Sequence, residues 1–282
     1  MNALEIHHLS KQYPEFTLKD LSFTLPSGCI LGLIGENGAG KSTTIKLILN
    51  MIRRDTGTVR VLGKDNREDF IHTKEEIGVV LDEVGYPEAL TAKQVNAIMK
   101  HTYRRWDERT YFRYLDQLSL PKDREFKEFS RGMKMKLGIA TALSHQARLL
   151  ILDEATSGLD PVVRDEVVDL FHEFTRDENH SILISSHIVS DLEKLCDYMA
   201  FLHKGELLLY DEKDVLLEHY GLIHGSREQI ARLDRAAIKG QKTTAYGVEA
   251  VVERRKVPVG MAISPIGIED LFIYMVKGDT VR

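Results

Sequence analysis

The sequence predicts an α/β fold built around a largely buried sheet. Short apolar runs of strand length alternate along the chain with longer segments of helical spacing. A wholly apolar run at 29–34 is followed by a glycine-rich turn and then by a helical segment, which is the order of a strand, a tight loop and a helix. The composition, with 43% hydrophobic and 29% charged residues, is that of a globular protein and excludes collagen and disorder.

Each element of the first half follows from a local pattern. Near-alternation of apolar and polar residues predicts the outer strands, and continuous apolar runs predict the buried ones. Apolar residues three and four apart predict the helices. The predicted elements are strands at 4–9, 16–25, 29–34 and 77–81, a helix at 41–52, and polar helical structure from 91 to about 119.

The second half repeats these patterns up to about residue 220. Lys204-Gly205 stands between two strand-like runs and is a two-residue hairpin signal. The predicted elements are a helix from Phe129 through Ala140, strands at 149–152 and 181–185 with a helix from near Pro161 between them, strands at 198–203 and 206–210, and a helix at 214–219.

Beyond residue 220 the pattern changes, and we expect 221–282 to form a small appended α/β unit beside a main domain at 1–220. Ser226, with Gln229 three residues later, is a capping signal for a helix. The other predicted elements of this unit are a strand at 222–224, a strand-like segment at 243–252 and an amphipathic helix at 268–276.

Charge and apolar patterning narrow the function classes. Against 43 acidic residues stand 38 Lys and Arg, a net charge of −5, so no overall basic field attracts nucleic acid or an anionic membrane. No run approaches the ~18–20 apolar residues of a membrane-spanning helix, and the first residues lack a signal-peptide pattern, so we expect a chain that neither spans a membrane nor is secreted. Cys29 and Cys196 lie in different apolar segments, which fits a reducing cytoplasm and excludes a disulfide framework.

A phosphate-binding loop follows the buried strand at 29–34. Its glycines allow backbone N–H groups to surround a phosphate, and the helix that it opens adds partial positive charge. The pattern predicts that the lysine reaches the β and γ phosphates of a nucleotide and that the serine hydroxyl faces Mg²⁺. The alternative, a chance glycine-rich turn, does not explain its place between a strand and a helix. The predicted nucleotide-binding residues are Gly35, Asn37, Gly38, Ala39, Gly40, Lys41, Ser42 and Thr43.

Two carboxylates end the apolar strand at 149–152. An aspartate at such a strand end holds Mg²⁺ in phosphoryl-transfer proteins, which makes Asp153 a metal-binding candidate. The adjacent Glu154 is then free to orient or deprotonate the attacking water. The alternative is an acidic helix N-terminus without catalytic meaning. The phosphate-binding loop elsewhere in the chain favours the catalytic interpretation.

Further motifs resemble the ABC ATPases. Ser130-Arg131-Gly132-Met133-Lys134 resembles their signature sequence, the segment ending at Asp160 resembles their D-loop, and His187 resembles their switch histidine. Tyr13 stands where that family has an aromatic residue that stacks on adenine. The resemblance covers about residues 2–219. It implies a P-loop NTPase core of ABC type with an antiparallel β subdomain and a helical subdomain at about 83–147.

These residues also have simpler interpretations. Ser130 at the start of a helix is a good N-cap, which is compatible with phosphate binding. His187 alone could be an ordinary surface or core histidine, although its place just after a buried strand favours the catalytic role. Tyr13 could pack in a strand rather than against adenine.

The sequence departs from the family pattern at two positions. Arg131 stands where the signature usually has its first glycine, a form that resembles a subgroup of bacterial exporters of antibiotics and antimicrobial peptides. Asp82 stands where the family has a glutamine that contacts Mg²⁺ and senses the membrane subunit. We expect Asp82 to retain the metal contact, since a carboxylate is a hard oxygen ligand. The alternative is a solvated loop carboxylate.

The resemblance implies an ATP- and Mg²⁺-dependent motor subunit of an ABC transporter. Two copies, or one copy and a homologous subunit, would pair head to tail, so that Ser130 and Gly132 of one reach the ATP of the other. Glu154 would then polarise water, His187 would steady the γ-phosphate and Asp160 would couple the two sites. A separate transmembrane permease would hold the subunit at the inner face of the cell membrane. The unit at 221–282 would strengthen the dimer or cap the main domain.

Other functions are weaker interpretations. A soluble ABC ATPase acting on ribosomes or DNA would use the same ATP site, but translation factors of this kind carry two cassettes and repair ATPases carry long coiled coils. The sequence shows one cassette and no sustained heptads. A P-loop kinase would not explain the signature-like motif. The basic and aromatic stretch 100–106 precedes Asp107 and Glu108, so a solvated helix face is favoured over a nucleic-acid site.

Overall fold

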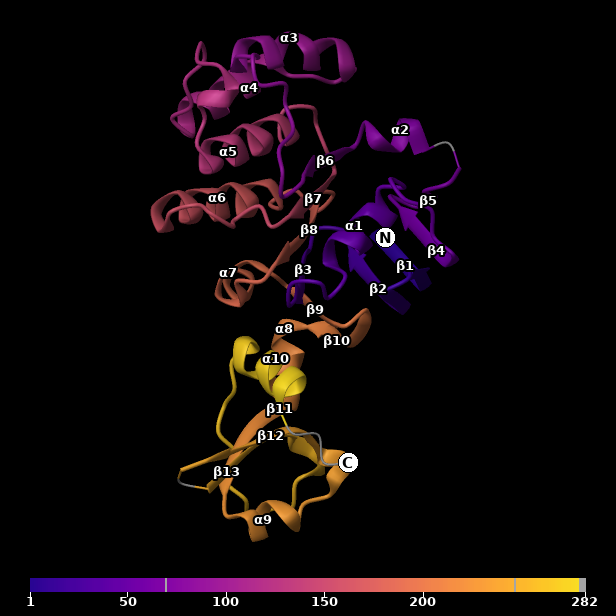
Figure 1. Cartoon of the computed structure of the whole chain (residues 1–282), viewed down its shortest axis with the longest axis vertical. Helices are drawn as coiled ribbons and strands as arrows, with labels where there is room; N and C mark the ends of the chain where they lie inside the picture. Colours follow the sequence, from indigo (N-terminus) through magenta and orange to yellow (C-terminus); the bar gives the residue numbers. More distant parts are fainter. Residues whose placement is uncertain (69, 246, 279–282) are drawn as a thin grey trace.

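A computed structural model of the protein describes residues 1–68, 70–245 and 247–278. The molecule is elongated (Figure 1): helices lie at one end, a large sheet occupies the middle, and the unit that follows β10 lies at the other end. The helices are α1 Lys41–Ile48, α2 Phe70–Lys74, α3 Ala92–Thr102, α4 Glu108–Gln117, α5 Arg131–Ala142, α6 Pro161–Phe174, α7 Val189–Leu195, α8 Lys213–His219, α9 Arg227–Ala231 and α10 Ile268–Lys277.

The main sheet has ten strands in the described part of the chain, in the order β5-β4-β1-β2-β10-β9-β3-β8-β7-β6. The neighbouring strands β9, β3, β8, β7 and β6 are parallel, and the neighbouring strands β5, β4, β1 and β2 pair antiparallel. The strands are β1 Asn2–Gln12, β2 Thr17–Pro26, β3 Ile30–Gly35, β4 Thr56–Val61, β5 Lys64–Asp65, β6 Ile77–Val80, β7 Leu149–Asp153, β8 Ser181–Ser186, β9 Tyr198–His203 and β10 Glu206–Glu212.

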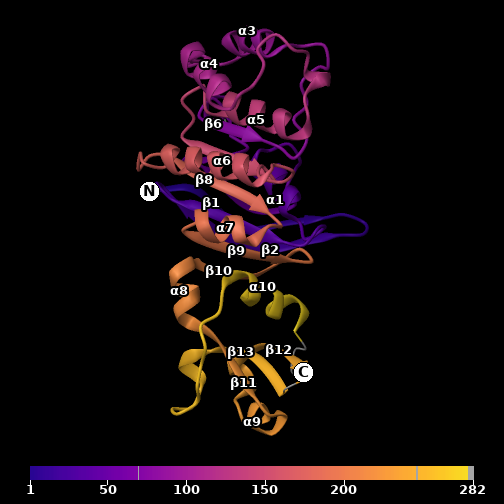
Figure 2. The same ribbon diagram turned by 90° about the vertical axis from the view of Figure 1, so that its left-hand side faces the viewer.

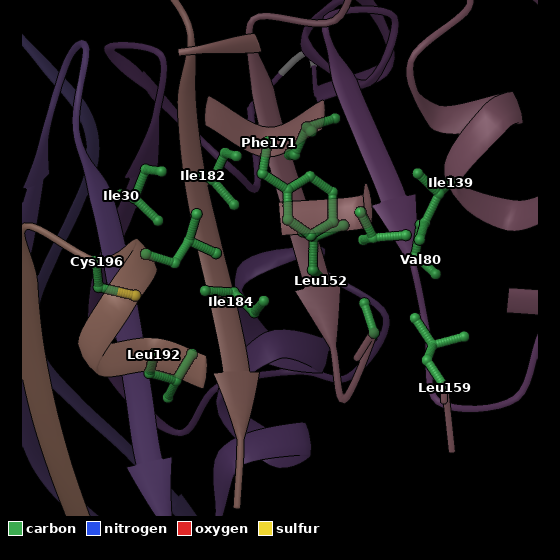
Figure 3. Close-up of a cluster of buried hydrophobic side chains, with 14 of the residues drawn as sticks. Ile30, Val80, Ile139, Leu152, Leu159, Phe171, Ile182, Ile184, Leu192 and Cys196 are labelled. Atoms are coloured by element: carbon green, nitrogen blue, oxygen red, sulfur yellow. The ribbon is translucent and has the colours of Figure 1, made fainter. Parts of the chain in front are cut away.

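The parallel strands are apolar on both faces because helices cover both faces. Leu31 and Leu183 point into a core cluster that includes α1, whereas Ile30 and Ile182 point into the opposite cluster beneath α5, α6 and α7. Figure 2 shows α6 and α7 lying across the sheet near β8 and β9. In Figure 3 the ring of Phe171, from α6, lies among strand side chains of this second cluster. Burial on both faces explains why these strands read as continuous apolar runs.

The segment after β10 forms a second, three-stranded sheet in the order β11-β13-β12. Its strands are β11 Tyr220–Gly225, β12 Ile238–Thr244 and β13 Gly247–Glu253. The last helix, α10, packs back against α7 and α8. The ring of Phe272 meets that of Phe201 in β9 edge to face, with centroids 5.4 Å apart. Helix α10 therefore shares the core of the main domain rather than lying apart from it.

Most expected elements are present, and one expectation is wrong. The segment 243–252, expected as a single strand, divides between β12 and β13, which pair as a hairpin with Thr244 opposite Gly247. Left-handed Lys204 and Gly205 form the expected tight hairpin between β9 and β10. Sequence patterns did not predict β4, β5, α2 or α7. Among the described residues, no helix has both the length and the apolar character that crossing a bilayer requires.

Candidate nucleotide-binding and catalytic site

The phosphate-binding loop connects β3 to α1 as expected. Gly38 and Gly40 adopt left-handed φ angles of 81° and 112°, a conformation that glycine enters at little cost. A Cβ on Gly35 would lie 2.6 Å from the carbonyl oxygen of Leu202, so only glycine fits at the end of β3. The loop therefore leads directly into the N-terminus of α1, where unpaired N–H groups favour an anion.

Lys41 lies under this loop with only 6% of its side chain exposed. Its Nζ donates a hydrogen bond to the carbonyl oxygen of Gly35 at 2.7 Å and lies 3.2 Å from Oε1 of Glu154. Lys41 and Glu154 thus neutralise each other at the floor of the site. An arriving phosphate would compete with Glu154 for the ammonium group.

Asp153 ends β7 beside the neighbouring strand β8. The Ser185 hydroxyl donates a hydrogen bond of 2.5 Å to Oδ1 of Asp153 and also accepts one from the backbone N–H of Glu154. Asp153 is 4% exposed, so this bond fixes the direction of a buried carboxylate. Asp153 and Ser42, which lies at the start of α1, carry the carboxylate and hydroxyl oxygens that Mg²⁺ prefers. Sequence analysis missed Ser185, because its role depends on the pairing of β7 with β8.

Glu154 and His187 come together across 33 residues of sequence. Nδ1 of His187 lies 2.7 Å from Oε2 of Glu154, which is 11% exposed, whereas the histidine side chain is 47% exposed. Glu154 itself has a left-handed φ of 54°, an uncommon conformation for a residue with a side chain. Two of the three expected catalytic residues, Glu154 and His187, therefore contact each other at the carboxyl end of the parallel strands, and the third, Lys41, contacts Glu154.

The two departures from the family pattern also meet. Nη2 of Arg131, at the start of α5, forms an ion pair of 2.7 Å with Oδ1 of Asp82, just beyond β6. Both side chains are about half exposed, at 62% and 49%. Asp82 was expected as a metal ligand, and in this structure its carboxylate is paired with a guanidinium.

Ser130 and Asp160 cap helices. The hydroxyl of Ser130 accepts a hydrogen bond from the backbone N–H of Met133 at 3.2 Å, and the carboxylate of Asp160 accepts one from Val163 at 3.1 Å. These bonds stabilise the N-termini of α5 and α6. The capping interpretation of Ser130 is confirmed, and it leaves the hydroxyl at a helix N-terminus.

These elements enclose one cleft of about 820 Å³. It lies at the carboxyl ends of β3 and β7, where ligands bind in open α/β sheets. Nine of the residues that sequence analysis selected line it, and so do Glu15, Phe16, Glu36, Arg131 and Ser157, which it did not select as site residues. The nine expected residues are Asn37, Gly38, Gly40, Lys41, Ser42, Thr43, Asp82, Glu154 and His187.

The aromatic residue at the cleft differs from the expected one. Of the described residues, Phe16 lines the cleft and Tyr13 does not; the Phe16 ring lies 2.9 Å from where a Cβ on Gly40 would be. Tyr13 is 37% exposed and its backbone N–H donates to the carbonyl oxygen of Phe16. The two belong to the same β1–β2 loop, so the motif position predicts the loop but not which ring faces the cleft.

Comparison with known proteins identifies this arrangement. The sequence model of the ABC transporter family matches residues 18–157. Bacitracin transport ATP-binding protein BcrA of Enterococcus faecalis is 33% identical over 73% of this chain and 68% of its own length. Lantibiotic transport ATP-binding protein SrtF of Streptococcus pyogenes is 35% identical over 75% of this chain and 91% of its own.

The fold agrees with the sequence match. A solved ATP-binding subunit of an ABC transporter has a TM-score of 0.70 and 28% identity, and the match covers 77% of this chain and 92% of that one. The site adds the nucleotide loop, Glu154 just after β7 and His187 just after β8 in one cleft, with Asp153 at the end of β7 beside Glu154. The chain therefore belongs to the ABC transporter ATP-binding family and is an ABC-type ATPase.

Proposed function

We propose that this chain is the motor subunit of an exporter of peptides or drugs. It works as a head-to-tail dimer, with itself or a homologous subunit, on a separate transmembrane permease. The observation that carries the ATPase part is the contact of Glu154 with both Lys41 and His187 at the floor of the cleft. The substrate class is supported by the names of BcrA and SrtF and by the Ser-Arg-Gly-Met form of the signature.

ATP would enter the cleft with its phosphates toward the loop between β3 and α1. Backbone N–H groups and Lys41 would neutralise the β and γ phosphates. As Lys41 turns to phosphate, Glu154 would be freed to accept a proton from the attacking water. His187, which contacts Glu154, would also bind the γ-phosphate. Ser42, Asp153 and Asp82 carry the oxygen donors suited to Mg²⁺, which would neutralise phosphate charge when bound.

The dimer would complete each site. Ser130 and Gly132 of a second copy would contact the γ-phosphate, and Asp160 would link the two sites through α6. Adenine would stack on an aromatic ring of the β1–β2 loop, which carries both Tyr13 and Phe16. Hydrolysis would remove the phosphate that bridges the two copies, and the dimer would open.

Co-purification from detergent-solubilised membranes tests the partner. The full chain, tagged and expressed in its own cells, should bring down a polytopic membrane protein at a fixed ratio and lie at the inner face of the cell membrane. The proposal names no nucleic-acid partner. Recovery with ribosomes or DNA, with no membrane protein, would favour the soluble ABC ATPase class instead.

A further inference from the structure

The ion pair between Asp82 and Arg131 takes no part in the proposed steps of ATP hydrolysis. It joins the loop after β6 to the first residue of α5, which are 49 positions apart in sequence. Both side chains line the nucleotide cleft. A cation at a helix N-terminus is electrostatically unfavourable, and α5 has no acidic residue in its first turn. The carboxylate of Asp82 offsets this cost.

The charge of the cleft indicates a ligand for Arg131. Among the described residues that line it are four carboxylates and two permanent cations, Lys41 and Arg131. A triphosphate must therefore find its counter-charges among these two cations, the backbone N–H groups and a metal ion. Lys41 is buried at the floor, whereas Arg131 lies at the rim with its guanidinium accessible.

The packing of Arg131 allows its guanidinium to change partner. The aliphatic part of the Arg131 side chain packs over Gly158. A Cβ added to Gly158 would lie 3.4 Å from Cδ of Arg131. The head is held by the exposed pair with Asp82, and an exposed ion pair is worth ~0–1 kcal/mol. The triphosphate of ATP carries more negative charge than a single carboxylate and can bind a guanidinium through two oxygens, whereas the contact with Asp82 is made through Oδ1, so phosphate outcompetes Asp82.

We propose that Arg131 is a phosphate-binding residue of the nucleotide site, held at the rim by Asp82 until the triphosphate of ATP displaces that carboxylate. The inference rests on the proposed function, because it requires ATP in this cleft. It accounts for both departures from the family pattern together: before ATP binds, Arg131 neutralises the Asp82 carboxylate, and Asp82 in turn holds the guanidinium at the rim of the cleft. The phosphate belongs to ATP in the cleft of the same chain or to ATP in that of a second copy.

A double-mutant cycle tests the exchange. Asp82→Asn, Arg131→Gln and the double variant are titrated with ATP in EDTA by calorimetry, which removes any contact between Asp82 and Mg²⁺. Arg131→Gln should weaken ATP binding about tenfold. Asp82→Asn should strengthen ATP binding about twofold to fivefold more when Arg131 is present than in the Arg131→Gln background, where only the direct repulsion between Asp82 and phosphate is removed.

A second measurement distinguishes the two sources of phosphate. In a Glu154→Gln background with Mg²⁺, sedimentation velocity reports ATP-dependent dimerisation. If Arg131→Gln weakens ATP binding to the monomer, Arg131 contacts the ATP of its own chain. If Arg131→Gln leaves ATP binding to the monomer unchanged but raises the half-saturating ATP concentration for dimerisation about tenfold, Arg131 contacts the ATP of the second copy.

The chain offers a matched control. Lys93 and Asp123 form an ion pair of the same 2.7 Å length, also exposed and also in the helical region, away from the cleft. Lys93→Gln and Asp123→Asn should leave both titrations unchanged. Arg131→Gln with wild-type affinity in both measurements, or an Asp82→Asn effect that is equal in the two backgrounds, would overturn the inference. Failure of the wild type to bind ATP at all would instead refute the proposed function.

Discussion

Replacement of Glu154 by glutamine separates ATP binding from ATP hydrolysis. The amide has nearly the same shape and can still contact His187, whose Nδ1 lies 2.7 Å from Oε2 in the wild type. It cannot accept a proton from water. It also carries no charge to hold Lys41, whose Nζ lies 3.2 Å from Oε1 of the glutamate. The change therefore removes the base and releases the phosphate-binding lysine.

The expected effect is large on turnover and small on binding. Loss of a positioned general base slows a reaction about 10²- to 10⁴-fold, which corresponds to ~3–5 kcal/mol in the activation barrier. Nucleotide affinity should be equal to or higher than that of the wild type, because phosphate no longer competes with Glu154 for Lys41. With hydrolysis blocked, the closed dimer should accumulate.

Phosphate release, ATP titration and sedimentation velocity on the same preparations measure the three effects. Glu173→Gln makes the same chemical change at an exposed position of α6 outside the cleft, so it should behave as wild type. Turnover of Glu154→Gln within about threefold of wild type would mean that Glu154 is not the base, and the mechanism above would be refuted.

Three further changes test other parts of the molecule. Ser130→Ala should reduce hydrolysis at least tenfold while monomer ATP binding stays unchanged; equal loss of monomer binding would contradict contact from a second copy. Phe272→Ala should lower the free energy of unfolding, measured in urea, by ~3–5 kcal/mol, because the Phe272 side chain is only 8% exposed. Ile273 lies on the same helix and is 41% exposed, so Ile273→Ala should lower it by under ~0.5 kcal/mol. Equal effects of the two changes would mean that α10 is not part of the core. Burial raises the pKa of Tyr86 to about 12, so native Tyr86 stays protonated while the unfolded chain ionises near pH 10. Wild type should therefore lose more stability between pH 10 and 12 than Tyr86→Phe, and parallel pH profiles would refute this.

Much of the fold could be predicted because its signals are local. The apolar runs that became β3, β7 and β8 are continuous because both faces of these strands are covered. The hairpin at Lys204-Gly205 follows from two left-handed residues in sequence. By contrast, β4 and β5 form one edge of the main sheet. These short strands mix polar and apolar residues without a clear alternation, so the sequence does not predict them. Strand-like residues continue on both sides of the turn between β12 and β13, so the local pattern predicts one strand where the structure has a hairpin.

The site divides in the same way. The phosphate-binding loop and the Asp153-Glu154 pair are each a contiguous motif at the end of a strand. The sequence by itself therefore predicted the chemistry that we propose for them. The loop also predicts a nucleotide phosphate as the ligand, since it needs only its own backbone and one lysine to hold phosphate, and the resemblance to ABC ATPases implies that the nucleotide is ATP.

Only the tertiary structure decided which groups meet between those motifs. Ser185 directs Asp153 because β8 pairs with β7, and Phe16 rather than Tyr13 lines the cleft because of how the β1–β2 loop lies over Gly40. Asp82 and Arg131, which the sequence marks as two separate departures from the family pattern, form an ion pair because α5 packs against β6. Contacts of this kind depend on strand order and helix placement, and no local pattern of residues encodes them.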